Sequence, residues 1–455
     1  MNGRFKSNFL KLPAVLLLII LCASIIYAQP AKESAINTDT IITVIKLLKQ
    51  QYIADININE FLNNAVRGSN AYLKFALKTK NDEIALLDPK EAPSENIKIF
   101  SNKMQDVFYK YKGKIDKSKL IYASIMGMLD ILAKPPYKDP YTIVMTPKEF
   151  KLLNEQMSGG NFGGIGIYIQ LDKKNNNRLT VIEPIESTPA YKAGIKTGDV
   201  ILKINDELTK GLDIDIAAQK IRGRIGTPVT LAIERGGKVK NYVIIRENIH
   251  VKSALAKLLN KKIGYIKLRY FGENTNLEFS EALKKIRERG ASALIVDLRN
   301  NGGGYIDASI DVCSKFLPRG SLIVSVINER TNYRQNYYSS GKELLSGIPV
   351  VILVNEYSAS ASEITAGALQ DTKKAVIIGE KSFGKASVQQ LYEFKDNGAI
   401  KYTIAHYFTP NGKNINEIGI VPDIKVKMDP AALGRDEDLQ LIEAVNYLIN
   451  KYNIK

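Results

Sequence analysis

The chain has 455 residues, of which 45% are hydrophobic and 24% are charged. This length exceeds one ordinary core, so two or three domains are expected, and the composition excludes a wholly disordered or polytopic membrane protein. The formal net charge of +17 suits nucleic acid, anionic lipid and acidic proteins alike. Because no nucleic-acid motif or concentrated Lys/Arg block occurs, we expect no nucleic-acid partner.

The few cysteines and histidines argue against disulfide and metal chemistry. Cys22 lies inside an apolar N-terminal run, so an intrachain disulfide with Cys313 is not expected in the mature protein. His250 and His406 are far apart in the sequence, and neither has a cysteine or paired carboxylate at ligand spacing. We predict no metal site and no cofactor.

The N-terminal segment 1–29 has the pattern of a signal peptide or membrane anchor. Three basic residues, Arg4, Lys6 and Lys11, precede an apolar stretch over 12–26, and Ala28 offers a cleavage point. We therefore predict export to the periplasm or cell envelope. Cleavage and retention as an inner-membrane tether over 12–28 both stay open, because Ile26 is larger than the residue usually preferred two positions before Ala28.

Residues 30–159 are predicted to be mainly helical, because apolar residues recur there at helical spacing. The recurring positions include Ile41, Ile42, Ile45, Leu47, Leu48, Ile121, Ile125, Met128, Leu129 and Leu132. A charged stretch over 78–96 interrupts the pattern, and a Pro-rich turn over 135–140 closes it. We expect this region to act as a scaffold or in self-association.

Residues 160–248 are predicted to form a small β-rich domain, and residues 249–430 an α/β core. In the first, short β-type runs alternate with Gly and Pro turns, with one helix expected over 215–222. In the second, strand and helix patterns alternate, as in the apolar strand 293–298. An amphipathic helix is expected within 431–455. The predicted fold class is therefore a multidomain α+β protein.

Ser360 stands where an apolar strand runs through small residues into a helix. Ser360 and Glu363 match a capping box, in which the two side chains satisfy free backbone N–H groups. A serine at a helix start also lies beside free N–H groups and the positive end of the helix dipole, which suits a nucleophile and its oxyanion. Spacing alone leaves both interpretations open.

A nucleophilic serine needs a base, and histidine is nearly absent. Lysine can serve when burial in apolar surroundings keeps its amine neutral. Lys385 lies between two predicted strands, but Lys373, Lys374 and Lys381 compete with it, and all four could be ordinary solvated lysines. Residue spacing does not select among them.

A third segment, 293–304, is an apolar strand that ends in three consecutive glycines. Glycines let backbone N–H groups approach a ligand closely. The turn could supply part of an oxyanion hole, cradle a phosphate or simply join a strand to a helix. The Lys-Ser/Thr pair of a P-loop and the dinucleotide spacing are both missing, which disfavours the nucleotide interpretation.

Together these segments resemble the C-terminal processing peptidases, also called tail-specific proteases, which are Ser/Lys serine peptidases of family S41 that carry a PDZ domain. The resemblance is collinear from about residue 139 to 423. The matching segments are DPYT at 139–142, GGIG at 163–166, 189–199, 222–223 with 226–227, DLRNNGGG at 297–304, SASASE at 358–363, GK at 384–385 and GIVPD at 419–423.

The resemblance implies a catalytic role for each matched site residue. Ser360 would be the nucleophile, Lys385 its base, and Gln389 the residue that orients the lysine. The backbone N–H groups of Gly303 and Ala361 would form the oxyanion hole. An acidic auxiliary position of the family is matched by Asp371.

The same resemblance makes 160–248 a PDZ domain whose loop binds a peptide carboxylate. The loop residues are Phe162, Gly163, Gly164, Ile165 and Gly166. PDZ domains add an extended peptide as a strand and hold its carboxylate on successive backbone N–H groups. Arg222 is the candidate relay between the PDZ domain and the peptidase core.

The implied function is that of a serine endopeptidase that recognises the free C-terminal tails of envelope proteins and cuts them through an acyl-enzyme. An adaptor or activator protein and a homo-oligomer are further partners that stay open. One alternative is a PDZ-bearing scaffold that binds peptides without cutting them. Another is a basic protein that acts at anionic lipid, whose binding would weaken with salt.

Overall fold

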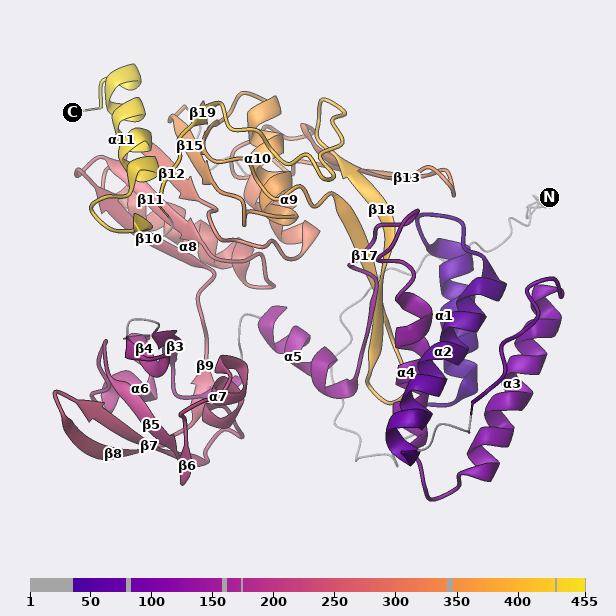
Figure 1. The fold of residues 1–455 in the computed structure, drawn as a ribbon. Coiled ribbons are helices and arrows are strands. Elements are labelled where there is room, and N and C mark those ends of the chain that lie inside the picture. Colours follow the sequence, from indigo (N-terminus) through magenta and orange to yellow (C-terminus); the bar gives the residue numbers. More distant parts are fainter. Residues whose placement is uncertain are drawn as a thin grey trace, which may run out of the picture.

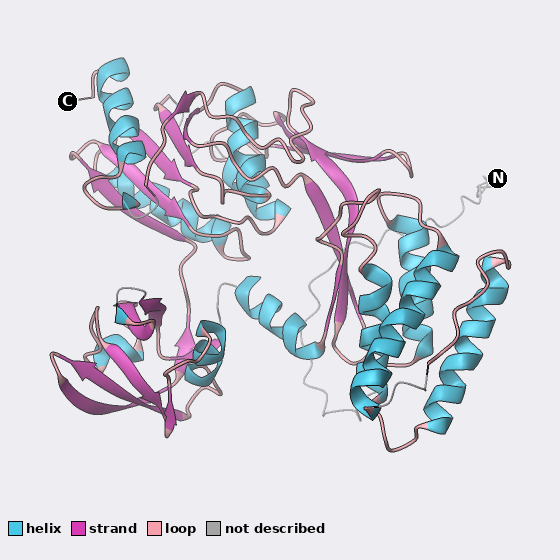
Figure 2. Ribbon diagram, viewed as in Figure 1, coloured by secondary structure: helices cyan, strands magenta, loops and turns pink. Residues whose placement is uncertain are grey.

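The computed structural model describes residues 36–78, 83–157, 162–172, 175–341, 347–429 and 432–454. They form a helical region, a small β-rich domain and an α/β core (Figure 1), and helices and strands are mixed in the last two (Figure 2). This is the expected α+β class. Within these residues, no helix is long and apolar enough to cross a membrane. The predicted signal or anchor segment, 1–29, lies outside the described residues.

Four helices form the N-terminal region. They are α1 (Thr38–Gln51), α2 (Ile58–Leu77), α3 (Pro93–Lys110) and α4 (Lys117–Leu129). Three of them are capped at the N-terminus by short polar side chains. Asn37, Asn57 and Asp116 accept hydrogen bonds from free N–H groups of the first turn. The apolar faces pack on one another and on Ile400 and Tyr402, which belong to a strand of the core.

That strand belongs to an antiparallel sheet which joins the helical region to the core. Its members are β1 (Ile143–Met145), β18 (Ala399–Phe408), β13 (Leu322–Asn328), β14 (Tyr333–Tyr338) and β17 (Ser387–Glu393). β1 comes from the region predicted to be helical, and it pairs with β18. The paired strands β17 and β18 extend from the core to α1 and α4 (Figure 1). The N-terminal region is therefore built into the scaffold of the core.

The small domain comprises residues 162–249 and carries its own apolar core. Its strands are β2 (Phe162–Gly164), β3 (Ile167–Asp172), β4 (Arg178–Pro184), β5 (Val200–Ile204), β6 (Glu207–Leu208), β7 (Pro228–Arg235), β8 (Lys238–Ile245) and β9 (Glu247–Ile249). Its helices are α6 (Pro189–Lys192) and α7 (Ile214–Ile221), the latter close to the predicted helix 215–222. Helix α5 (Pro147–Met157) precedes the domain.

The core is built on a mostly parallel sheet of order β10-β11-β12-β15-β16-β19. The strands are β10 (Ala254–Leu259), β11 (Ile263–Leu268), β12 (Ala293–Asp297), β15 (Val350–Val354), β16 (Val376–Gly379) and β19 (Ile424–Lys425). One face packs on α8 (Thr275–Glu288), α9 (Ile306–Cys313) and α10 (Ala361–Asp371), and the other on α11 (Leu439–Tyr452). Because β12 and β15 are buried on both faces, they have the continuous apolar sequence of parallel strands.

Candidate active site at the carboxyl ends of three strands

Three loops that follow the adjacent parallel strands β12, β15 and β16 meet at one edge of the core sheet. Open α/β sheets bind ligands at the carboxyl ends of such strands. The loops are bonded to one another: the Ala359 N–H donates to the Asn301 carbonyl at 3.0 Å, and the Phe383 N–H donates to the Ser358 carbonyl at 3.0 Å. The order of the strands therefore brings together segments that are far apart in the sequence.

Ser360 occupies a strained turn between β15 and α10. Its φ of 56° and ψ of −117° lie outside the regions that L-residues normally adopt. Ala361 is the first residue of α10, so the serine sits at the helix end where N–H groups are free. The predicted capping box with Glu363 is present. Capping and a nucleophilic position are thus compatible at this serine.

Glu363 connects the turn that carries Ser360 to the loop that carries Lys385. This carboxylate is fully buried, and one of its oxygens, Oε2, accepts the N–H groups of both Ser360 and Lys385 at 2.9 Å. The other oxygen accepts the Gly384 N–H at 2.7 Å and the Ser382 hydroxyl at 2.5 Å. The sequence indicated only the capping bond of Glu363; the contact with Lys385 depends on how β15 and β16 pair.

Tyr407 supports the same two segments from the sheet of β18. Its buried hydroxyl donates to the Lys385 carbonyl at 2.6 Å and lies 3.2 Å from the Ser360 carbonyl. Burial and the nearby Glu363 carboxylate raise the pKa of this phenol well above its usual value, so it stays a neutral donor. Nothing in the local sequence distinguishes Tyr407 from an ordinary strand tyrosine.

Lys385 is the half-buried member of the four competing lysines; Lys373, Lys374 and Lys381 are exposed. Its Nζ lies 4.5 Å from the centre of the Tyr141 ring. Burial lowers the pKa of Lys385, and the positive charge of Lys401 lowers it further, while Asp139 and Glu363 act in the opposite direction. A lowered pKa increases the fraction of neutral amine, which is the form that can accept a proton.

The glycine turn after β12 lies against Ser360. A Cβ on Gly303, whose φ is +101°, would lie 2.8 Å from the Ser360 Cβ and 2.9 Å from the Ala361 nitrogen, so no larger residue fits. The Gly303 N–H donates to the Asn301 side-chain oxygen at 2.9 Å, and the Gly303 carbonyl accepts the Phe271 N–H at 2.9 Å. The two predicted oxyanion donors are therefore neighbours, and the Gly303 N–H would have to turn from Asn301 toward a substrate.

Gln389 and Asp371 lie differently with respect to Lys385 and Ser360. Gln389 lies two positions beyond the start of β17. Its side-chain amide donates to the Ser387 hydroxyl at 2.8 Å and lies 3.5 Å from the Thr403 hydroxyl. Asp371 ends α10, roughly 15 Å along the helix from Ser360. There it accepts the Asn411 N–H at 2.9 Å. The orienting role of Gln389 and the auxiliary role of Asp371 remain predictions.

The two histidines lie on β18 and directly after β9. His406 is on β18, opposite Ser387, and burial lowers its pKa, although Asp139 and Glu329 oppose the shift. His250 follows β9 and contacts the Glu278 carboxylate. In the described part of the chain, no group of three or more His, Cys, Asp or Glu side chains could hold a metal ion.

The small domain presents an apolar groove of about 300 Å³ beside the predicted carboxylate loop. Its lining comes from the loop and β3 on one side and from α7 on the other, with Arg222 at the end of α7. The lining residues include Gly164, Ile165, Gly166, Ile167, Ile169, Ile214 and Ile221. Phe162 and Gly163 lie on β2, which pairs with β9. The groove between β3 and α7 is where a peptide that adds to β3 as a further strand is expected to bind.

The loop has a fixed shape. Its Ile165 and Gly166 carbonyls accept the N–H groups of Ala190 and Ile185 at 2.8 and 2.9 Å. Gly166 has a φ of +77°, and a Cβ there would lie 2.4 Å from the Thr188 side chain. A glycine is therefore required at this position.

Both domains are similar to known protein families. Residues 262–426 match the model of peptidase family S41, and residues 163–245 match that of the PDZ domain. A Staphylococcus aureus (strain COL) protein named "Probable CtpA-like serine protease" is 37% identical over 329 residues, which are 71% of this chain and 64% of that protein. Its Staphylococcus epidermidis counterpart is 37% identical over 333 residues, or 73% and 65% of the two chains.

The chain thus spans about 64% of the length of the S. aureus relative. A solved structure titled "Putative S41 protease from Bacteroides fragilis NCTC 9343" aligns with a TM-score of 0.50 and 15% identity, over 94% of this chain and all of that one. At this identity the likeness concerns the fold alone.

Proposed function

Because residues 262–426 match the model of peptidase family S41 and residues 163–245 match that of the PDZ domain, we propose that the protein is a serine endopeptidase with a Ser360/Lys385 pair. The observation that carries this proposal is the shared carboxylate. One oxygen of Glu363 holds the backbone of both residues. Among the competing lysines only Lys385 is half-buried, and burial lowers its pKa.

The proposed reaction is an acyl transfer in two steps. Neutral Lys385 takes the proton of the Ser360 hydroxyl while the oxygen attacks the peptide carbonyl. The resulting oxyanion is stabilised by the Ala361 N–H, at the positive end of α10, and by the Gly303 N–H. Protonated Lys385 then delivers its proton to the leaving amine, and water hydrolyses the acyl-enzyme by the same steps in reverse.

The proposed substrates are proteins with a free C-terminal tail. The apolar groove between β3 and α7 suits an extended tail with an apolar final residue, whose carboxylate would bind in the loop 162–166. The peptide bond to be cut lies upstream of that tail. Arg222, at the end of the groove, is the proposed relay to the core.

We further propose that the protein acts in the periplasm or cell envelope after export. The basic residues before the apolar stretch 12–26 support this location. Cell fractionation tests it: the protein, or a form shortened at its N-terminus, is expected with the envelope or periplasm. Recovery of the full-length chain in the cytosolic fraction would contradict the proposal.

The decisive experiment is cleavage of an unfolded protein that ends in an apolar residue. We expect cleavage by the wild type and loss of about 10³-fold or more in rate for Ser360→Ala and for Lys385→Ala. Lys381→Ala, four positions from the base but exposed, is the matched control and should cleave normally.

Retention of cleavage in both site variants would refute the assignment of Ser360 and Lys385. Tail binding without cleavage by the wild type would instead favour the peptide-binding scaffold. A fluorophosphonate probe separates these cases, since a competent serine reacts with it even when no peptide is cut. We expect labelling of the wild type and none of Ser360→Ala.

A further inference from the structure

A buried guanidinium connects the turn after β12 to the C-terminal helix. The Arg299 side chain is fully inaccessible to solvent. Its Nε and Nη2 donate to the two Asp297 oxygens at 3.0 and 2.8 Å, and its Nη1 and Nη2 donate to the two Asp438 oxygens at 2.6 and 2.9 Å. Nη1 also donates to Gln440 Oε1 at 3.1 Å. The five N–H groups of the guanidinium can all be satisfied by these contacts.

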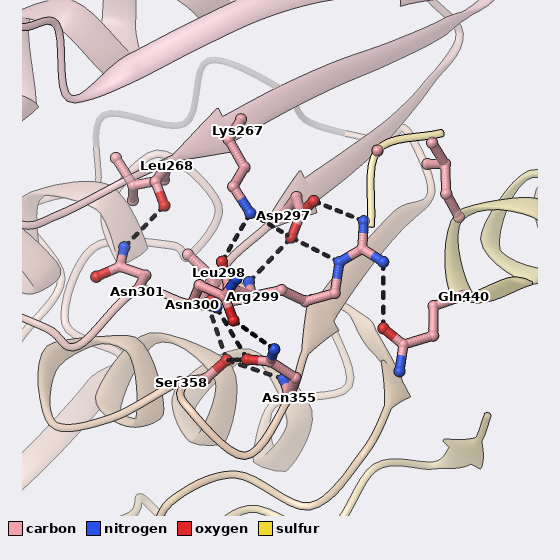
Figure 3. A network of polar contacts seen from close by, with 12 residues as sticks. Lys267, Leu268, Asp297, Leu298, Arg299, Asn300, Asn301, Asn355, Ser358 and Gln440 are labelled. Carbon is pink, nitrogen blue, oxygen red and sulfur yellow. Dashed lines mark hydrogen bonds and ion pairs between the residues drawn. The ribbon is translucent and has the colours of Figure 1, made fainter. Parts of the chain in front are cut away.

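The charges in this cluster balance. Lys267 Nζ lies 3.2 Å from Asp297 and donates to the Arg299 carbonyl at 2.7 Å (Figure 3). Burial alone would raise the pKa of Asp297, but Lys267 and Arg299 hold it at about 2. Two cations therefore face two carboxylates, one of them from a segment 139 residues away. Removal of either carboxylate leaves a buried positive charge without its partner.

The same turn carries the glycine that lies against Ser360. Asn300 has a left-handed φ of 60°, and its N–H donates to the Asn355 side chain at 2.9 Å. Asn301 donates from its amide to the Leu268 carbonyl at 2.9 Å and accepts the Gly303 N–H. Figure 3 shows these side chains together with Arg299 and Gln440. The polar contacts of the C-terminal helix and those of Gly303 are thus joined through the backbone of residues 299–301.

Asp438 has a second set of bonds at the start of α11. Its oxygens accept the Leu441 N–H and the Gly434 N–H, both at 3.0 Å. It is the N-cap of the helix and a partner of Arg299 at the same time. Docking of α11 and the position of Arg299 therefore depend on one carboxylate.

We propose that Asp438, assisted by Gln440, is a positioning residue for the oxyanion side of the Ser360 site. The C-terminal segment holds Arg299, Arg299 holds the start of the turn 300–304, and the turn places Gly303 beside the nucleophile. The inference rests on the proposed peptidase function. It assigns a catalytic consequence to a segment that follows the last strand of the core sheet.

The test is Asp438→Asn, because asparagine caps helices as well as aspartate does but removes the negative charge. With a peptide substrate we expect kcat to fall by about tenfold or more with a change in KM below about twofold, since a misplaced oxyanion donor affects the transition state rather than binding. A carboxylate restored next to the guanidinium, in Asp438→Asn combined with Gln440→Glu, is expected to raise kcat above that of the single variant.

The matched control is Leu448→Ala in the same helix. Leu448 is fully buried in the apolar cluster between α11 and the core sheet. The Leu448→Ala substitution should weaken the packing of α11 on the sheet while leaving the charged groups around Arg299 in place. At a temperature where every variant is folded by circular dichroism, we expect kcat within about twofold of the wild type.

Hydrogen–deuterium exchange of the segment 299–304 supplies a readout independent of catalysis. We expect faster exchange there in Asp438→Asn, and unchanged exchange in Leu448→Ala. An active wild type together with an unchanged kcat in Asp438→Asn, or unchanged exchange of this segment, would overturn the inference. A wild type that cleaves nothing defeats the proposed function instead, and the exchange result still decides whether Asp438 positions the turn.

Discussion

The Ser360 site and the PDZ groove between β3 and α7 are held in shape by different interactions. At the Ser360 site, buried charges fix the backbone: Glu363 accepts four hydrogen bonds of 2.5–2.9 Å, and Arg299 is held by two carboxylates. In the groove, the backbone of 164–166 and an apolar lining define the shape. Buried charge contacts depend steeply on distance and partner, whereas apolar contacts are individually weak and numerous. Single substitutions should therefore be far more damaging at the Ser360 site.

The largest effect is expected for Glu363→Gln, which disrupts the Ser360 site. A glutamine amide has one acceptor oxygen, and its NH2 group can only donate, so it cannot accept the hydrogen bonds now made to the second carboxylate oxygen. The Ser360 and Lys385 segments would therefore shift apart. We expect kcat to fall by about 10²-fold or more and the free energy of unfolding by about 3 kcal/mol, measured with a peptide substrate and by urea denaturation.

Glu149→Gln is the matched control for that variant. Glu149 also accepts the N–H of a helix-capping residue, Thr146, at 2.8 Å, but it is exposed and lies on α5. We expect kcat close to that of the wild type. A similar loss in both variants would mean that Glu363 acts only as a helix cap.

An intermediate effect is expected for Gly166→Ala in the PDZ groove. The added Cβ would meet Thr188 and impose a left-handed φ on alanine, so the carboxylate loop must shift. We expect the affinity for a C-terminal peptide, measured by fluorescence anisotropy, to fall about tenfold, while fluorophosphonate labelling of Ser360 is retained. Gly211→Ala has a similar φ of +79° but open space around its Cβ, and it should bind the peptide normally. Equal losses would point to general destabilisation of the domain.

The smallest effect is a change in pH dependence caused by Lys401→Met. The Lys401 charge lowers the pKa of Lys385, so its removal should raise that pKa. Because the neutral amine is the base, kcat/KM rises with pH through this pKa, and the rising limb should move to higher pH in the variant. The exposed Lys425→Met is the control and should leave the profile in place. A limb that does not move, or moves to lower pH, would contradict the proposed electrostatic role of Lys401.

The sequence predicted the elements that position the site because their patterns are local. The apolar run 350–354 forms β15 as expected, and the small residues after it form the turn with Ser360. Glu363 was visible as a capping partner because a capping box spans only four residues. β1 was not foreseen, since its three residues pair with β18 across more than 250 positions of sequence. Its pairing joins the helical region to the core.

By itself, the sequence determined the strand, turn and helix around Ser360, the glycines of the two loops and, through the family resemblance, the choice of Lys385. Only the tertiary structure decided which lysine is half-buried, that Glu363 bridges Ser360 and Lys385, and that Asp438 reaches Arg299. The physical reason is the sequence separation over which each kind of interaction acts. Propensity and capping act over a few residues, whereas burial and ion pairing depend on strand order, which brings distant segments to one edge of the sheet.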